Sequence, residues 1–506
     1  MVSVNSNIAS VDARNSLMGN NVMMETAIQR LSSGKRINQA SDDAAGLQIA
    51  NNLTSQINGL KMATKNAGDG ISLINTVDGG LAEATDILQR MRELAVQSSS
   101  DTNSGQDRVF IQDEINALNT ELNRISSTTQ FNGVNVLDGT FGDISLQVGY
   151  DVSQTVNMSV NSSDTTTLGA YQRNSVVEDL ATSVDTYALA SSAHGAALVD
   201  GADYTVSGFF GSDTAYVNAS ADARDVAAAF NLISGNTGIA ASAETRARLT
   251  MSAAGTITFS LYGKSSTAST VTATVTAISD LTNLKDAING VSGSTGIEAT
   301  LTSDKAGVNI INPEGYTIYF ADVTAAGGAD VDLNVGTLEY SAAAAETVGT
   351  LHAMKGDAAT DDSNFVLGKV TLSSDKAFSM ASGHANNHFS GATTVLASSL
   401  SQLGDINLKN VHGAQKALAI IDKAINMVDT TRSTMGALNN RLESTIENLS
   451  NIKVKSEASL SRIMDADYAE ETTALSKSQV LSQAATAMLA QANQAPQGVL
   501  RLLQAA

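Results

Sequence analysis

The sequence predicts a multidomain α+β fold. Long antiparallel coiled-coil helices from both chain ends form a bundle with a small β-hairpin, and β-rich outer domains are inserted between them. Two observations carry this prediction. Apolar residues recur every seven positions near both ends of the chain, as in helices packed in coiled-coil fashion. The middle is instead rich in Ala, Ser, Thr, Gly and Asp, with short strand-like runs between turn clusters.

Composition narrows the classes of function. The chain has 506 residues and a net charge of −21, which argues against a nucleic-acid partner. Cysteine is absent, which removes disulfides, thiol chemistry and cysteine zinc sites. No apolar run approaches the roughly 18 residues of a membrane span, and the first residues lack the pattern of a secretory signal. We therefore expect no nucleic acid, no membrane insertion, no cofactor and no metal.

The N-terminal region predicts two helices. Residues 1–34 carry a broad apolar face at helical spacing. Residues 35–43 break the register, and Ser41 and Asp42 there are suited to cap a following helix. That second helix runs over residues 44–96. Its glycines can mark close approach of a neighbouring element, and they lie at positions 59, 68, 70, 79 and 80.

A third helix and a hairpin follow. The polar turn at 98–107 precedes a helical pattern over 108–126, and its shortness predicts that the second and third helices are antiparallel. Turn dipeptides at 132–133 and 138–139 then separate short β-prone runs, and apolar residues alternate over 144–148. A small β-hairpin beside the helices is the expected result.

The longest apolar pattern lies in the last ninety-odd residues. No proline interrupts it before Pro496, so one helix or two end-to-end helices are expected from Val411 to Leu503. Such a stripe needs partners of similar length, which only the N-terminal helices offer. The predicted coiled-coil core consists of Leu53, Leu60, Ile74, Leu81, Leu88, Ile421, Val428, Met435, Leu442 and Leu449.

The middle section is acidic and contains an internal repeat. Residues 171–400 hold 10 Lys and Arg against 23 Asp and Glu, so this section carries −13 of the net charge of −21. The run AFNLISGNTGIAAS (229–242) resembles AINGVSGSTGIEAT (287–300), and each leads from a short helix signal into a strand. A solenoid needs at least three copies, so two related βα-type units are expected.

These patterns divide the chain into three predicted domains. Residues 1–43 and 461–506 form a terminal helical domain. Residues 44–162 and 403–460 form an inner helical bundle with the hairpin, and residues 163–402 form the acidic β-rich outer part.

Several long motifs resemble those of bacterial flagellins. The segments QRLSSGKRINQASDDAAGLQIA (29–50), LQRMRELAVQS (88–98), TQFNG (129–133) and GALNNRLESTIENL (436–449) are similar to segments that flagellins share, and the resemblance covers roughly half the chain. The GNTGI and GSTGI copies also resemble a short repeat of some flagellins and hook-associated proteins. The ending VLRLLQAA departs from the usual form by being longer.

The resemblance implies a non-enzymatic structural protein. Flagellins build a helical filament, the propeller of the bacterial flagellum, from both chain ends and place a variable domain outside. They are exported unfolded by the flagellar type III apparatus, which implies a secreted, extracellular protein. The implied partners are further copies of the chain, the filament cap and hook-junction proteins, and an export chaperone at the C-terminal helix.

The terminal stripes have too few partners within one copy. We therefore expect their apolar surface to be buried between subunits, through head-to-tail contacts that do not close, and the ends to be disordered in a free monomer. The predicted polymerisation interface consists of Ile8, Val11, Leu17, Met18, Val22, Met24, Ile28, Leu31, Leu475, Leu481, Met488, Val499 and Leu502.

Host recognition is a further implication of the resemblance. In flagellins the positions matching Gln89, Arg90, Leu94 and Glu114 form a patch gripped by the animal Toll-like receptor for flagellin. A plant receptor kinase senses the stretch matching 29–50. The alternative is that these residues serve contacts between protofilaments, and both roles can hold together.

One motif points to chemistry. His384 and His388 have the spacing of the helical HExxH zinc motif, but Ala385 replaces the catalytic Glu and the surroundings indicate a loop. Solvated histidines are favoured. Three alternatives stay open: a hook–filament junction protein, a secreted coiled-coil adhesin, and a flagellin with an embedded zinc peptidase.

Overall fold

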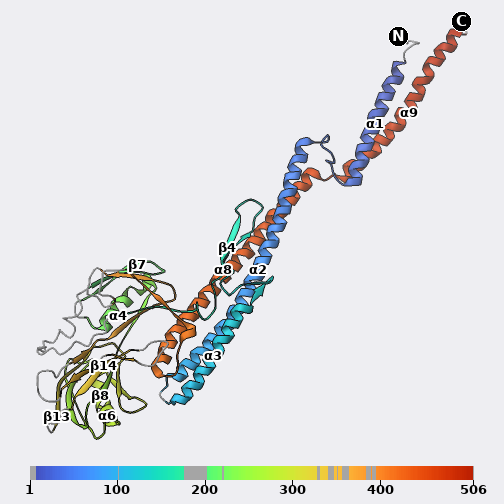
Figure 1. Ribbon diagram of the computed structural model, residues 1–506. Helices are drawn as coiled ribbons and strands as arrows, with labels where there is room; N and C mark the ends of the chain where they lie inside the picture. Colours follow the sequence, from blue (N-terminus) through green and yellow to red (C-terminus); the bar gives the residue numbers. More distant parts are fainter. Residues whose placement is uncertain are drawn as a thin grey trace. The chain divides into compact units, whose positions relative to one another are not determined.

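The computed structural model confirms the predicted fold class, with long helices at both chain ends and a β-rich middle (Figure 1). It divides into two compact units, and helices α2 (Ala44–Ser98) and α8 (Val411–Met464) contribute to both. The structure describes residues 7–100, 102–175, 202–218, 221–326, 331–339, 347–349, 351–355, 364–382, 389 and 395–504.

The first unit comprises residues 1–75, 143–159 and 435–506. It holds α1 (Ile8–Ser33), the first part of α2, the hairpin of β3 (Asp143–Gln147) and β4 (Thr155–Ser159), the last part of α8, and α9 (Tyr468–Gln504). The C-terminal pattern thus forms two helices separated by a short break. Helices α1 and α9 lie side by side (Figure 1).

In the first unit, α2 packs against α8 and against the hairpin. Leu60, Ala63 and Leu449 form a buried cluster between the two helices. Two of the predicted close approaches are present. A Cβ on Gly59 would lie 2.8 Å from the Cβ of Tyr150, and a Cβ on Gly70 would lie 2.6 Å from a methyl group of Leu146 in β3. Gly68 has nothing within 4 Å.

The second unit comprises residues 76–142 and 160–434. Its helical part contains the rest of α2, α3 (Gly105–Thr128) and the start of α8. Ser104 and Asp107 form a capping box that begins α3. Strands β1 (Gln130–Phe131) and β2 (Val134–Asn135) pair through a two-residue turn. Its central residues have φ of 50° and 79°, which suits the Asn-Gly pair there.

Ion pairs show that the α2 and α8 segments of the second unit are antiparallel. Arg432 contacts Asp78 at 2.9 Å, and Arg92 contacts Asp422 at 2.6 Å. The later residue of α2 thus pairs with the earlier residue of α8. Gly80 also marks a close approach, because its Cβ would lie 2.7 Å from a methyl group of Leu137.

In the β-rich part of the second unit, the described residues form three antiparallel sheets. One has the strand order β10-β9-β13-β17, a second β20-β19-β6-β7, and a third centres on β8, which pairs with β12, β14 and β18. The elements are β5 (Gly169–Asn174), β6 (Ala202–Ser207), β7 (Ser212–Val217), α4 (Ala223–Leu232), α5 (Ser234–Thr237), β8 (Ala240–Met251), β9 (Gly255–Tyr262), β10 (Ser269–Val275), α6 (Thr282–Gly290), α7 (Ser292–Thr295), β11 (Glu298–Leu301), β12 (Val308–Asn312), β13 (Ile318–Ala326), β14 (Leu333–Glu339), β15 (Thr347–Val348), β16 (His352–Met354), β17 (Asn364–Val366), β18 (Lys369–Ser374), β19 (Ser379–Ser382), β20 (Leu396–Ala397), β21 (Ser399–Gln402) and the short helix η1 (Leu403–Asp405).

The two copies of the sequence repeat form the same contacts. Asn231 of α4 exchanges two hydrogen bonds with the backbone of Ala241, and Asn289 of α6 does the same with Ala299. In each copy a glycine in the left-handed region then ends the following short helix, with φ of 76° and 67°. The first copy packs its helix on β7, β8 and β18, and the second on β10 and β11.

Candidate assembly interface

Helices α1 and α9 form an antiparallel pair with a narrow seam. Ala27 of α1 and Ser478 of α9 are 2% and 3% exposed, and such small residues allow two helix backbones to lie close together. Leu17, Met24 and Leu31 of α1 are seven apart and only partly exposed, as is Leu475 of α9. This part of the predicted polymerisation set is therefore partly covered within a single chain.

Polar contacts fix the register of the pair at its far end. Asn7 caps α1 by accepting a hydrogen bond from the Ser10 amide, and its Nδ2 donates to the carbonyl of Ala492 at 2.8 Å. The Ser10 hydroxyl donates to Asn493 at 2.8 Å. The start of α1 is thus bonded to the last part of α9.

At the other end the two connections pair with each other. The segment after α1 and the segment between α8 and α9 form a short antiparallel bridge through Lys35 and Asp465. The Arg36 amide donates to the carbonyl of Met464 at 2.6 Å, and the Ala466 amide donates to that of Gly34 at 3.0 Å. Gly34 has φ of 69°, which lets the chain leave α1 in this direction.

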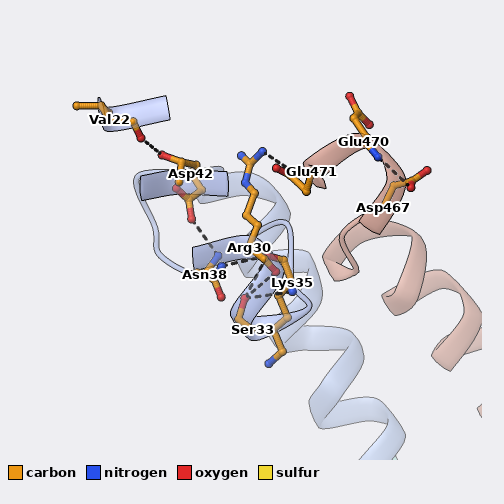
Figure 2. Close-up of polar contacts among 10 residues, drawn as sticks. Val22, Arg30, Ser33, Lys35, Asn38, Asp42, Asp467, Glu470 and Glu471 are labelled. Atoms are coloured by element: carbon orange, nitrogen blue, oxygen red, sulfur yellow. Dashed lines mark hydrogen bonds and ion pairs between the residues drawn. The ribbon is translucent and has the colours of Figure 1, made fainter. Parts of the chain in front are cut away.

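An ion pair crosses from α1 to α9 just beyond this bridge. The Arg30 Nη1 lies 3.0 Å from Oε1 of Glu471, and the two side chains are 31% and 10% exposed (Figure 2). Asp467 accepts hydrogen bonds from the amides of Ala469 and Glu470 and so caps α9. We call the bridge and this ion pair the clasp, formed by residues 34–36, 464–466, Arg30 and Glu471.

The turn between α1 and α2 is held by Asp42. Its Oδ2 accepts hydrogen bonds from the amides of Asn38 and Gln39 at 2.9 and 3.0 Å (Figure 2). These backbone hydrogen bonds lower the pKa of Asp42 below its ordinary value, because they favour the charged carboxylate. The carboxylate therefore caps the turn, while Asp43 accepts from the Gly46 amide at the start of α2.

Most of the remaining predicted interface residues point into solvent. The exposed fractions reach 66% at Ile8, 65% at Met18, 62% at Val22 and 66% at Met488. Val11, Ile28 and Leu481 are also exposed, at 55%, 49% and 40%. The side chains of Val499 and Leu502 lie outside the described part of the structure. A single chain thus leaves apolar side chains open along both helices.

Sequence reasoning missed two exposed members of this surface. Met23 on α1 is 60% exposed and Val480 on α9 is 64% exposed. Each is adjacent in sequence to a predicted residue, so each lies about 100° away around its helix. A stripe-based prediction follows one face only, whereas the exposed apolar residues here cover a wider arc.

The predicted coiled-coil core residues are buried in one chain, with one partial exception. Leu53 near the start of α2 is only partly buried. The exposed fraction is 6% or less at the other predicted positions, which are Leu60, Ile74, Leu81, Leu88, Ile421, Val428, Met435, Leu442 and Leu449.

Of the four residues in the predicted receptor patch, three lie on the surface and one is buried in the core. The guanidinium of Arg90 bonds to Oε1 of Glu114 at 2.7 and 3.0 Å and to Glu93 at 3.0 Å. The hydrogen bonds to Glu114 and then to Glu93 raise the pKa of Arg90. Gln89 is exposed, but Leu94 is only 2% exposed and packs inside the second unit. A receptor would therefore meet Arg90, Glu114 and Gln89 and not the Leu94 side chain.

No metal centre is found among the described residues. Within that part of the chain no group of His, Cys, Asp or Glu is arranged to hold a metal ion. His384 and His388, the predicted histidine motif, lie outside it. None of the helices that the structure describes combines the length and hydropathy needed to cross a bilayer.

The chain is similar to known proteins over its whole length. Family models match at residues 4–142 (bacterial flagellin N-terminal helical region), 418–503 (bacterial flagellin C-terminal helical region) and 256–312 (flagellin hook IN motif). The B-type flagellin of Pseudomonas aeruginosa is 38% identical over 99% of this chain and 100% of its own length. Flagellin B of Vibrio cholerae is 33% identical, with 99% of each chain covered.

Comparison with solved structures matches FliC from Burkholderia pseudomallei. It has a TM-score of 0.28 and 19% identity, with 74% of this chain and 99% of that chain covered. The flagellar junction protein FlgL from Legionella pneumophila has a TM-score of 0.34 and 12% identity, with 82% and 99% covered.

Proposed function

We propose a mechanism of assembly from one premise: this chain belongs to the bacterial flagellin family and is a structural subunit of the flagellar filament. In this mechanism the exposed apolar faces of α1 and α9 form the polymerisation interface between copies. One observation carries it. The paired helices still expose Ile8, Met18, Val22 and Met488 by more than 60% each.

The exposed faces provide the driving force for assembly. Burial of a large apolar side chain contributes about 1.5–3 kcal/mol, so several such residues per copy supply a strong drive to associate. The clasp supports this surface, because it joins α1 to α9 and holds the two helices in one register. When one face of each copy meets a different face of the next copy, head to tail and without closing into a ring, the contacts extend into a filament.

Seeded polymerisation of a point variant tests the interface. The substitution Val22→Asp places a charge at a position that assembly would bury, while Val22 is 62% exposed in one chain, so folding of the chain itself is spared. The matched control is Leu232→Asp, which adds the same charge to a residue of α4 that is 87% exposed. The critical concentration is measured by light scattering and the product by electron microscopy.

We expect Val22→Asp to raise the critical concentration more than tenfold, which corresponds to ~1.4 kcal/mol or more. Leu232→Asp should leave it unchanged. An unchanged critical concentration for Val22→Asp would show that α1 is not part of the interface. A rise for Leu232→Asp as large as that for Val22→Asp would show that added charge alone is responsible.

We propose that the chain is non-enzymatic, is exported unfolded by the flagellar type III apparatus and acts outside the cell, beside cap and hook-junction proteins. An export chaperone would cover α9 before assembly, since Val480, Leu481 and Met488 are exposed there. Removal of residues 468–506 should then abolish the chaperone complex in native mass spectrometry. A complex that survives the truncation would argue against a site on α9.

Recognition by the Toll-like receptor for flagellin is supported by the surface around Arg90. This guanidinium joins α2 to α3 through Glu114, so a folded monomer presents a fixed charged pair. We expect Arg90→Ala and Glu114→Ala to weaken activation of receptor-expressing reporter cells. The control is Arg124→Ala, which removes another exposed arginine paired with a glutamate. Equal activation by the Arg90 and Arg124 variants would count against this site.

A further inference from the structure

The hairpin between β6 and β7 ends in two adjacent exposed phenylalanines. Phe209 and Phe210 are 68% and 71% exposed, and they lie between Gly208 and Gly211. Single exposed apolar side chains are ordinary in soluble proteins, but two large rings side by side concentrate apolar surface at one point. We call Phe209 and Phe210 the aromatic tip. The assembly mechanism makes no use of it.

The internal repeat shows that the fold does not need an aromatic residue at this place. Each copy is preceded by a strand hairpin, β6–β7 before the first and β9–β10 before the second. The glycines that follow β6 and β9 lie against a backbone carbonyl of α5 and α7 respectively, which leaves no room for a Cβ at Gly208 or Gly263. The second copy then continues with Lys264, whose Nζ lies 2.9 Å from Glu314. The same scaffold thus carries a polar turn in one copy and the aromatic tip in the other.

The rings of the tip are held in place. Their centroids are 5.6 Å apart in an edge-to-face arrangement, and a ring carbon of Phe210 lies 2.9 Å from where a Cβ of Gly238 would be. The Nζ of Lys376 lies 5.7 Å from the centroid of Phe209, within the range of a cation–π contact. Because the rings are already oriented, docking would cost little side-chain entropy.

The size and place of the tip favour a lipid surface over a protein. Two aromatic side chains offer at most about 150–250 Å² each, whereas a stable protein interface buries about 800 Å² per partner. A small apolar tip on a hairpin can enter the boundary between lipid headgroups and acyl chains, where aromatic side chains are favoured.

Charge around the tip selects the kind of lipid. Asp213 follows Phe210 by three residues, Asp375 precedes Lys376, and residues 171–400 hold 23 acidic against 10 basic residues. Such a surface is repelled by an anionic bilayer. A phosphocholine headgroup instead offers a quaternary ammonium to the carboxylates and aromatic faces, and a phosphate to Lys376.

We propose that the aromatic tip inserts into the phosphocholine surface of a lipid bilayer. The inference rests on the proposed function in one respect, because the resemblance to flagellins implies that the β-rich part lies outside the filament. Two rings in one copy bind weakly. Many copies on one filament would bind a vesicle together, and linked weak sites gain affinity through their high effective concentration.

Vesicle binding by the full chain tests this inference, both as monomer and as filament. Co-flotation is measured with vesicles of pure phosphatidylcholine and with vesicles that contain equal phosphatidylcholine and phosphatidylserine. The test variant carries Phe209→Ser and Phe210→Ser, which gives the turn the polar character of the second copy. The control is Ile278→Ser, which removes a 49% exposed apolar side chain from a loop of the second copy.

We expect the double variant to bind phosphatidylcholine vesicles at least tenfold more weakly, which corresponds to ~1.4 kcal/mol of binding free energy. The control should bind with unchanged affinity. Phosphatidylserine should weaken binding. Equal binding by the double variant, or stronger binding with phosphatidylserine, would overturn the proposal. So would sedimentation data in which the double variant loses self-association of the monomer, since the tip would then contact a second copy. Binding by monomers but not by filaments would support insertion of the aromatic tip into lipid. It would contradict the placement of the β-rich part outside the filament.

Discussion

At the scale of single residues, the clasp depends on two charged side chains that lie 441 positions apart in the chain. Arg30 belongs to the last turn of α1 and Glu471 to the first turn of α9, and nothing in their local sequence indicates a contact. Asp42 is different. Its place before α2 identified it as a capping residue from sequence, although its carboxylate closes the turn at Asn38 rather than the helix itself.

Loss of the clasp ion pair should weaken the filament. In assembled filaments we expect Arg30→Ala and Glu471→Ala each to destabilise by about 1–3 kcal/mol, because each leaves a largely desolvated charge without its partner. The double variant should be little worse than either single one. Depolymerisation temperature and critical concentration measure the effect.

The matched control for the clasp is Arg124→Ala. Its ion pair with Glu121 is 58% and 45% exposed, so its removal should cost only about 0–1 kcal/mol. Equal losses for Arg30→Ala and Arg124→Ala would show that the clasp is an ordinary surface ion pair.

A buried histidine should make the second unit sensitive to mild acid. His412, in the first turn of α8, is 4% exposed. Its pKa is lowered to about 2 by burial first and then by Arg246, Lys416 and Lys369. Glu244 lies 3.5 Å from its Nε2 and favours the charged form, but burial outweighs it because desolvation acts on the whole ring. The folded state therefore keeps the imidazole neutral.

The sign of the pH effect follows from this lowered pKa. Above about pH 6.5 neither state binds the proton, and below it only the unfolded state does, so stability falls by ~1.4 kcal/mol per pH unit. We expect urea unfolding between about pH 6.5 and 5 to show this slope in the native chain and to lose it in His412→Gln. Equal slopes in the two proteins would contradict a neutral buried imidazole.

At the scale of elements, heptad spacing predicted the buried faces of α2 and α8 well, because a coiled-coil seam repeats regularly along both helices. It could not predict where the C-terminal pattern breaks. Residues 465–467 separate α8 from α9 without proline or glycine, and the break depends on the long-range bridge of Lys35 with Asp465. The same limit explains Leu53, whose burial depends on neighbours and not on its heptad position.

Two glycines of α2 should respond in opposite ways to alanine. At Gly59 the new Cβ would lie 2.8 Å from the Cβ of Tyr150, so we expect Gly59→Ala to destabilise the monomer by about 1–3 kcal/mol. At Gly68 nothing lies within 4 Å, so Gly68→Ala should stabilise by ~0.5–1 kcal/mol through helix propensity. Urea unfolding of the two variants beside the native chain measures both. A stabilising Gly59→Ala would show that the hairpin does not press on α2.

At the scale of the whole molecule, the sequence predicted the fold class and the family resemblance because both rest on long regular patterns. The strand pairing of the β-rich part was harder to predict from the sequence, because its sheets join strands that lie far apart in the chain, such as β5 with β18 and β21. The candidate interface between copies stays a prediction. Leu17 and Met24 are partly covered within one chain, whereas Met18 and Val22 are exposed and could meet a neighbouring copy. Sequence periodicity cannot distinguish these two kinds of position.

We infer that the two chain ends together form the polymerisation interface. Seeded growth of the full chain, followed by light scattering and electron microscopy, tests it most directly beside a chain that ends before residue 465. We expect filaments from the full chain and only monomers from the truncated one. Filaments from the truncated chain, or none from either, would contradict it.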